Sequence, residues 1–372
     1  MRLDRLITLN VVQPLRRLFK VQSSKFKVQS FSPAINSQLS TINSKWAVPI
    51  LMYHSISDDP ELGVSPYYEV NTRPAVFRQH MQFLAGQGYQ TISLDELVGI
   101  LTTGPLDYRT MGPLDYRTTG LLDHRTTGLL DNEVTMQRGP ISDSQHFSIS
   151  AFPKPVVLTF DDGFRDFYTE AFPVLQTHGF TATVFLPTAF IGDDRRQFRP
   201  STLNYQLSTT KDCLTWPEVL ELRRHGIHFG SHTVNHPKLV ELDWPEIAAE
   251  LSNSKSEIEQ QLGEPATTFC YPYAFPQTDH QFVHRFTDLL SDTGYRSCAT
   301  TALGRVRPGT DPFRLKRLPA NSLDDLALFA AKLDGAYDWL AAPQSAAKAL
   351  KALVRPQRRF RPSTLNPQPS TL

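Results

Sequence analysis

The feature that most restricts the fold of this 372-residue chain is a regular alternation of short apolar runs with longer amphipathic stretches. Amphipathic stretches of helical length occur at 74–88, 164–178, 216–225, 244–262 and 279–293. Strand-like runs rich in β-branched and aromatic residues lie around them: VPILMYHSI, YQTISL, PVVLTFDDG, TATVFLPTAF, IHFGSHTV, ATTFCYPYA, YRSCATT and RLKRLPAN. Repeated βα units predict a mainly parallel sheet, and about seven of them predict an α/β barrel, whose reactive residues follow the carboxyl ends of the strands.

Charge and composition exclude several classes of function. With 38 Lys+Arg against 37 Asp+Glu, the formal net charge is +1, so we expect no nucleic-acid partner. No apolar run is long enough for a transmembrane segment. Cys213, Cys270 and Cys298 show no CxxC spacing and predict neither a disulfide framework nor a zinc ribbon. The apolar run in residues 1–20 is broken by Gln, Pro and paired arginines, and we expect no export signal there.

Low-complexity segments divide the chain into one domain with insertions and tails. We predict a catalytic barrel over 47–338, a low-complexity tail at 1–46 and a second tail at 339–372. Four copies of an octad such as GPLDYRTT mark an insertion at 104–152, and these short units favour a surface insertion over a binding array. A second insertion, 195–212, contains FRPSTLN, which recurs near the C-terminus, and we expect no chemistry from it.

Two adjacent carboxylates end the run PVVLTFDDG. Asp161 and Asp162 follow mostly apolar residues, and Gly163 permits a sharp turn out of the strand. Because neighbouring side chains of a regular strand point to opposite faces, one aspartate could bind a metal while the other acts beside it as a base. A helix N-cap pair for the segment beginning at Phe164 is the alternative interpretation of an isolated DDG.

Two histidines follow the strand-like run IHFG. His232 and His236 have i, i+4 spacing, which predicts that both imidazoles lie on one side of a helical turn and chelate one metal ion. Two imidazoles and one carboxylate leave coordination positions open for water and substrate, as hydrolytic sites require. Solvated or core histidines are the alternative for a lone HxxxH, but a strand-terminal DDG in the same chain favours the metal site.

TFDDG, then SHTVNHP, then YPY is a motif order that resembles the polysaccharide deacetylase family, the NodB-like carbohydrate esterases. The resemblance implies a distorted (β/α)7 barrel of the NodB type. It implies that Asp161 is the catalytic base and that Asp162, His232 and His236 hold the metal. It also implies that Tyr271, Pro272 and Tyr273 contact the substrate, with the Tyr273 backbone N–H helping to hold the oxyanion.

Two positions depart from the family pattern. Many members have an Arg that orients the base where this chain has Cys270, two residues before Pro272. The family's usual acid, a His late in the chain, has no counterpart after His284. LMYHSIS resembles the permuted branch of the family, which carries this His on the first strand, and the resemblance therefore assigns the acid to His54, across the scissile bond from the metal.

The expected function is a metal-dependent hydrolase that removes N-acetyl groups from a polysaccharide containing N-acetylglucosamine and releases acetate. Zinc is the expected cofactor, with cobalt, nickel or iron as alternatives, and an N-acetylated polysaccharide is the expected partner. Members of this family usually work outside the cytoplasm, at the cell envelope. Two rival hypotheses are a non-catalytic carbohydrate-binding barrel and a hydrolase of another non-peptide carbon–nitrogen bond, and release of acetate from a glycan separates them.

Overall fold

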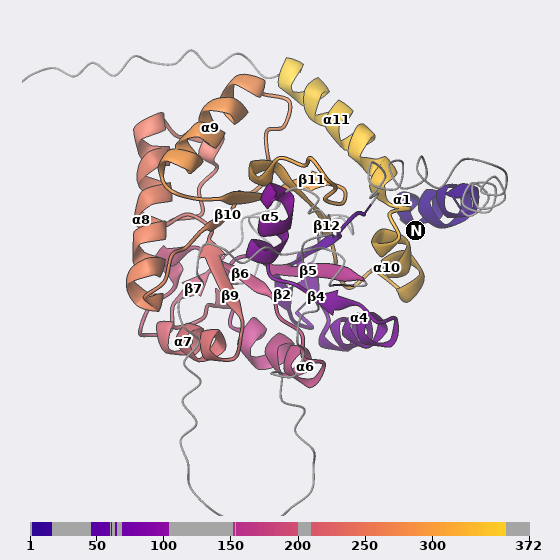
Figure 1. Cartoon of the computed structure of the whole chain (residues 1–372), viewed down its shortest axis with the longest axis horizontal. Helices are drawn as coiled ribbons and strands as arrows, with labels where there is room; N and C mark the ends of the chain where they lie inside the picture. The colour runs from indigo at the N-terminus through magenta and orange to yellow at the C-terminus, as the bar shows by residue number, and fades with distance from the viewer. Residues whose placement is uncertain are drawn as a thin grey trace, which may run out of the picture.

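Seven parallel strands form a closed barrel at the centre of the molecule (Figure 1). The computed structural model describes residues 2–16, 46–59, 61, 64, 69–103, 152, 154–199 and 210–354. Around the barrel the strands are β1 (Ile50–Tyr53), β12 (Leu315–Pro319), β11 (Ser297–Leu303), β10 (Thr268–Cys270), β9 (His228–Ser231), β6 (Thr183–Leu186) and β5 (Pro155–Phe160), which pairs again with β1. A further strand, β4 (Gln90–Thr91), pairs with the first residues of β5. Each of the eight predicted strand segments contains one of these strands, and the predicted barrel is confirmed.

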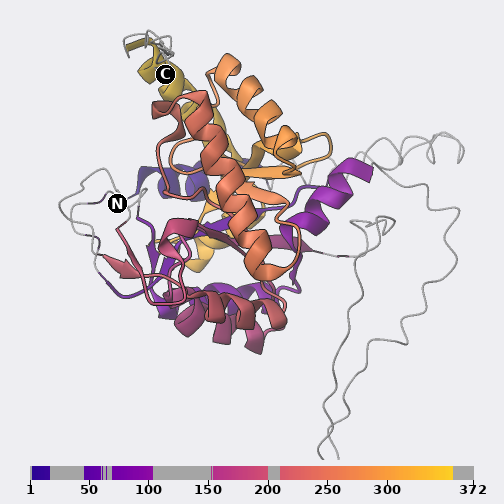
Figure 2. The same ribbon diagram turned by 90° about the vertical axis from the view of Figure 1, so that its left-hand side faces the viewer.

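Helices surround the barrel, and all five predicted helical stretches contain one (Figures 1 and 2). The helices are α4 (Pro74–Gly86), α5 (Leu94–Thr103), η4 (Phe167–Ala171) continuing into α6 (Phe172–Thr177), α7 (Trp216–Arg224), α8 (Trp244–Leu262), α9 (His280–Asp292) and α10 (Leu326–Leu333). The longest, α8, begins with a capping box in which Asp243 accepts from the Glu246 N–H at 2.9 Å and Glu246 accepts from the Asp243 N–H at 2.8 Å. It ends at Gly263 in the left-handed conformation.

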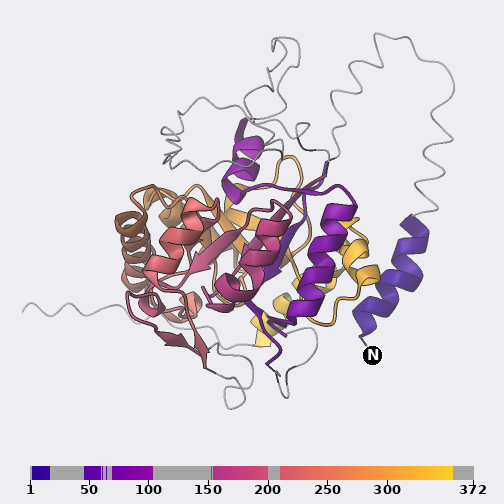
Figure 3. The ribbon, with the colours of Figure 1, turned by 90° about the horizontal axis from the view of Figure 1, so that it is seen from below.

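Helix α5 closes the amino-terminal end of the barrel. Its residues Leu94 and Leu97 are fully buried in one cluster with Ile50 of β1, Val157 of β5 and Leu315 of β12. This apolar plug leaves the carboxyl ends of the strands as the end where polar side chains gather. Figure 3 shows α5 at the opposite end of the molecule from the small β7–β8 hairpin.

The β7–β8 hairpin is formed by the ends of the predicted insertion 195–212. Its strands β7 (Gln197–Phe198) and β8 (Lys211–Asp212) are antiparallel, and the residues between 199 and 210 lie outside the described part of the chain. A second small pair, β2 (Ser55–Ile56) with β3 (Asn71–Thr72), lies directly after β1. Both pairs contribute residues beside the carboxyl ends of the barrel strands.

Parts of both predicted tails form helices that contact the rest of the domain. At the N-terminus, α1 (Leu3–Ile7) continues into η1 (Thr8–Val12), which contacts α10. At the other end, α11 (Ala341–Val354) packs against β11, and the Lys348 ammonium donates to the Phe275 carbonyl at 2.9 Å. These contacts join residues far apart in sequence, so local composition does not reveal them.

The remaining low-complexity segments lie outside the described residues. These are 21–45, 355–372 and the octad insertion, of which only residue 152 is described. Among the helices described, none is both long and apolar enough to cross a bilayer. The domain boundaries within these segments therefore stay predictions.

Candidate active site

The two aspartates lie where β5 leaves the barrel. Strand β5 ends at Phe160, and the Asp161 N–H still donates to the Tyr53 carbonyl of β1 at 3.0 Å. Asp162 has a φ of 72° and Gly163 a φ of 60°, so the chain turns sharply instead of continuing as a strand. A Cβ on Gly163 would lie 3.0 Å from the Leu186 Cδ2 atom, so a larger residue would crowd β6. Both carboxylates thereby remain buried at the carboxyl end of the barrel.

The two histidines lie in a tight loop after β9, and the prediction of a helical turn is wrong. Thr233 has a φ of 70° and His236 a φ of 52°, both in the left-handed region. The Thr233 hydroxyl accepts from the His236 N–H at 2.9 Å. One carboxylate of α8, Glu250, accepts from the backbone N–H groups of Val234 at 2.8 Å and Asn235 at 2.9 Å. These bonds satisfy the donors of the loop and hold a conformation that is unfavourable for non-glycine residues.

This loop brings both imidazoles to the Asp162 carboxylate. The Asp162 Oδ1 atom lies 3.5 Å from His232 Nε2 and 3.3 Å from His236 Nε2. The three ligand atoms lie within 4.8 Å of one another. A tetrahedral zinc ion with bonds of about 2.1 Å separates its ligand atoms by about 3.4 Å. The predicted metal ligands thus form a group with the spacing that such an ion requires.

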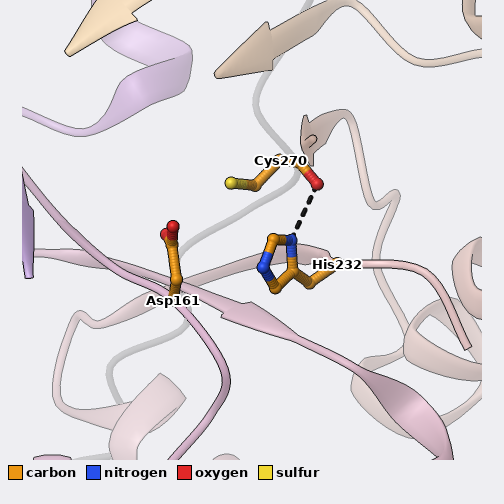
Figure 4. Close-up of side chains that lie close together, drawn as sticks. All are labelled: Asp161, His232 and Cys270. Carbon is orange, nitrogen blue, oxygen red and sulfur yellow. Dashed lines mark hydrogen bonds between the residues drawn. The ribbon is translucent and has the colours of Figure 1, made fainter. Parts of the chain in front are cut away.

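The chemistry of these donors also fits a cation. Among the described residues, the buried Asp162 Oδ1 atom has no hydrogen-bond partner. Burial lowers the pKa of His236 to about 4, so its imidazole is neutral at ordinary pH, the form that binds metals. The His232 Nδ1 atom lies 2.7 Å from the Cys270 carbonyl oxygen (Figure 4), and this bond leaves Nε2 directed at Asp162.

The buried partner of Asp161 is Arg317, a residue that the sequence analysis did not single out. The Arg317 guanidinium, fully buried on β12, donates to the two Asp161 oxygens at 2.7 and 2.8 Å. It also donates to the Cys270 sulfur at 3.1 Å. Burial would raise the pKa of Asp161, but the charge and hydrogen bonds of Arg317, together with the nearby histidines, more than offset it and hold this pKa well below its usual range. The arginine absent at position 270 is therefore replaced in space by one from another strand.

A second group of possible ligands, Asp161, His232 and Cys270, overlaps the first (Figure 4). It suits a cation less well, because both Asp161 oxygens already accept from a guanidinium. Burial also raises the pKa of the Cys270 thiol, whereas metals bind the thiolate. Of the two groups, the one that contains Asp162 therefore fits a cation better.

His54 lies beside the Asp161 carboxylate, between β1 and β2. Its Nε2 atom is 3.7 Å from Asp161 Oδ2, and its side chain is 19% exposed, whereas that of Asp161 is 3% exposed. The histidine is thus adjacent to the carboxylate that the sequence predicts as the base. It is also the more accessible of the two groups.

Of the three residues in YPY, only Tyr273 is partly exposed. Its ring lies 4.6 Å from the His236 ring, and its φ of 58° turns the chain at this point. Tyr271 and Pro272 are buried, and the Tyr271 ring packs edge-to-face on Phe275 and Phe286 in the core beneath α9. That these residues contact substrate stays a prediction, and the packing of the Tyr271 ring in the core argues against such a contact for Tyr271.

Comparison with known proteins points to one enzyme family. A sequence profile of the polysaccharide deacetylases matches residues 150–297. YxkH, a Bacillus subtilis protein named for the same family, is 26% identical over 271 residues, which cover 73% of this chain and 70% of YxkH. Residues 150–297 thus match the polysaccharide deacetylase family. The predicted resemblance to this family is confirmed, whereas its assignment to the permuted branch stays a prediction.

Solved structures show the same fold. The Streptococcus pyogenes deacetylase PplD, in complex with acetate, is 21% identical with a TM-score of 0.51, over 78% of this chain and 99% of that one. A polysaccharide deacetylase from Bacillus cereus is 20% identical with a TM-score of 0.50, over 78% of this chain and 69% of that one. These likenesses confirm the deacetylase-type barrel.

Proposed function

We propose that this chain is a metal-dependent hydrolase that removes N-acetyl groups from a polysaccharide containing N-acetylglucosamine. The observation that carries the proposal is the juxtaposition of two buried groups at one end of the barrel. One is the group of metal ligands Asp162, His232 and His236, and the other is the ion pair of Asp161 with Arg317. A carbohydrate-binding barrel without activity would need neither the ligands nor an arginine-paired carboxylate beside them.

Each residue has one task in the proposed reaction. A divalent cation held by Asp162, His232 and His236 would acidify water and polarise the acetyl carbonyl. Asp161 accepts the proton of the attacking water, and Arg317 keeps Asp161 ionised and fixed in orientation. The Tyr273 N–H donates to the oxygen on which negative charge develops.

His54 completes the reaction as the acid. The carbon–nitrogen bond of the acetamide breaks only if the departing nitrogen receives a proton, because an amide anion is a poor leaving group. Protonated His54 supplies that proton from its position 3.7 Å from the Asp161 carboxylate. The products are acetate and the free amine on the sugar.

The experiment is an acetate-release assay on the metal-loaded and the chelator-treated protein. We expect acetate from N-acetylglucosamine oligomers, loss of activity after chelation, and recovery with zinc or with cobalt, nickel or iron. Binding of the oligomers without acetate release would instead indicate a carbohydrate-binding barrel. Hydrolysis of small amides alone would assign the site to another carbon–nitrogen bond and contradict the proposed substrate.

A further inference from the structure

The two metal-binding histidines are oriented by different means. The His232 ring is held by the carbonyl oxygen of Cys270, 2.7 Å from Nδ1. The corresponding His236 Nδ1 atom is buried and has no hydrogen-bond partner among the described residues. Metal-binding histidines usually donate their second N–H to a partner that fixes the ring. Some other contact must therefore set the orientation of His236.

Two aromatic rings contact His236, and one of them, Phe198, belongs to β7. The Phe198 ring lies 5.2 Å from the His236 ring at an interplanar angle of 68°, an edge-to-face arrangement. Phe198 is only 6% exposed, and it also packs on Phe190 at 4.5 Å and on Phe164 at 6.0 Å. The Tyr273 ring contacts His236 at 4.6 Å. The His236 ring is thus positioned by the packing of Phe198 and Tyr273.

A buried carboxylate holds the chain immediately after His54. Asp166, on the segment after β5, accepts hydrogen bonds from the Ser55 hydroxyl and from the Ile56 N–H at 3.0 Å. Burial raises the pKa of Asp166, against the lowering effect of these two donors and of the Lys211 charge, while Asp59 adds a like charge nearby. Asp166 therefore fixes the first residues of β2 through two hydrogen bonds.

The cation that faces Asp166 comes from β8. Lys211 is 8% exposed, and its ammonium lies 4.0 Å from Asp166 Oδ2 and 2.9 Å from Asp59 Oδ2. A carboxylate taken out of water needs such a partner, because an uncompensated buried charge is strongly unfavourable. Lys211 thereby acts on the segment that begins with His54, although the two residues are far apart in sequence.

We infer that the β7–β8 hairpin positions both halves of the catalytic centre. One half is the group of metal ligands, and the other is the segment that carries the acid His54. Its Phe198 holds the metal ligand His236, and its Lys211 holds the segment after His54 through Asp166. The inference rests on the proposed function, since it assigns roles relative to the metal and the acid. It gives chemistry to a segment whose sequence predicts none.

The metal half is tested by zinc affinity, measured by competition with a chromophoric chelator. Phe198→Leu keeps apolar volume but removes the ring, and we expect zinc binding about 10-fold weaker, as for other residues that orient metal ligands. Phe198→Tyr keeps the ring and is expected to bind zinc as the unmodified protein does. Unchanged zinc affinity in Phe198→Leu would contradict this half of the inference.

The acid half is tested by steady-state kinetics at saturating zinc. Lys211→Met removes the cation, and we expect kcat to fall about 10-fold with KM and zinc affinity unchanged, because misplacing a reacting group costs rate. Lys211→Arg keeps the charge and is expected to retain kcat. A Lys211→Met protein with normal kcat, or one that also loses zinc, would contradict this role for Lys211.

A matched control comes from the same hairpin. Arg199 is exposed, and Arg199→Ala is expected to leave zinc affinity and kcat unchanged. If the unmodified protein neither binds zinc nor releases acetate, the proposed function fails and the inference fails with it. If the unmodified protein is active and both Phe198→Leu and Lys211→Met behave like it, only the inference fails.

Discussion

At the scale of single residues, the sequence predicts the metal ligands well because their motifs are local. Asp162, His232 and His236 each follow a strand that its apolar composition identifies, and the structure brings their ligand atoms within 4.8 Å. The roles of these residues stay proposals, but their proximity is as expected. The chain brings these side chains together through residues with positive φ, and not through the helical turn that the i, i+4 spacing suggests.

Arg317 escaped prediction because its partner is not local. It lies 156 residues from Asp161, on a strand separated from β5 by β1 in the barrel. The run RLKRLPAN contains three cations, and only the direction of each side chain reveals that Arg317 is buried. A cation at an inward position of a predicted buried strand is a signal that could have identified it.

Arg317→Lys tests how the base is held. Lysine keeps a positive charge but loses the two parallel hydrogen bonds to Asp161, so we expect kcat to fall about 10- to 100-fold with zinc still bound. Because Arg317 lowers the pKa of Asp161, weakening this pair should raise that pKa. The carboxylate must be ionised to act as a base, so the loss of activity at acidic pH should begin at a higher pH.

Cys270→Ala is the matched control for Arg317→Lys. It removes the sulfur that accepts from Arg317 at 3.1 Å and leaves both bonds to Asp161 in place. We expect a nearly normal pH–rate profile. A profile shifted as far as that of Arg317→Lys would show that the thiol, and not the guanidinium fork, positions the base.

At the scale of elements, the strands and helices could be predicted, whereas the loops that shape the site could not. The length and end signals of α8 are in its sequence, from Asp243 to Gly263. That α8 also holds the histidine loop is visible only in three dimensions. Glu250 accepts from Val234 N, from Asn235 N and, at 2.7 Å, from Asn235 Nδ2.

Glu250→Ala should therefore weaken metal binding at a distance from the ion. Without this carboxylate the loop loses three hydrogen bonds that support its left-handed residues, and we expect zinc affinity about 10-fold lower. Gln260→Ala, at an exposed position on the same helix, should bind zinc normally. Equal zinc affinities of the two variants, measured by chelator competition, would rule out this role for Glu250.

At the scale of the whole molecule, alternating βα units were enough to predict the barrel, because seven parallel strands close in only a few ways. The packing of both chain ends was missed, because the contacts that hold these ends join residues far apart in sequence. Arg2 illustrates the difficulty: its guanidinium lies 3.0 Å from Asp324, 322 residues away. Asp324 is fully buried and also pairs with Lys332 at 2.6 Å.

Arg2→Met should lower the free energy of unfolding because it removes a charge partner from a buried carboxylate. We expect a loss of about 1–3 kcal/mol, as for other hydrogen bonds to charged groups. Arg5 pairs with Asp325 near the surface, with side chains 35% and 48% exposed, so Arg5→Met should cost less than about 1 kcal/mol. Equal losses in urea denaturation would mean that the N-terminal helix does not contribute through Arg2.

The central claim, that Asp162 binds a metal while the adjacent Asp161 acts as a base, is tested most directly by metal content measured together with acetate release. Asp162→Asn is expected to lose the ion and the activity. Asp161→Asn is expected to keep about one ion per chain and to release no acetate. If both variants lose the metal equally, or if Asp161→Asn still turns over, the division of labour between these two carboxylates is wrong.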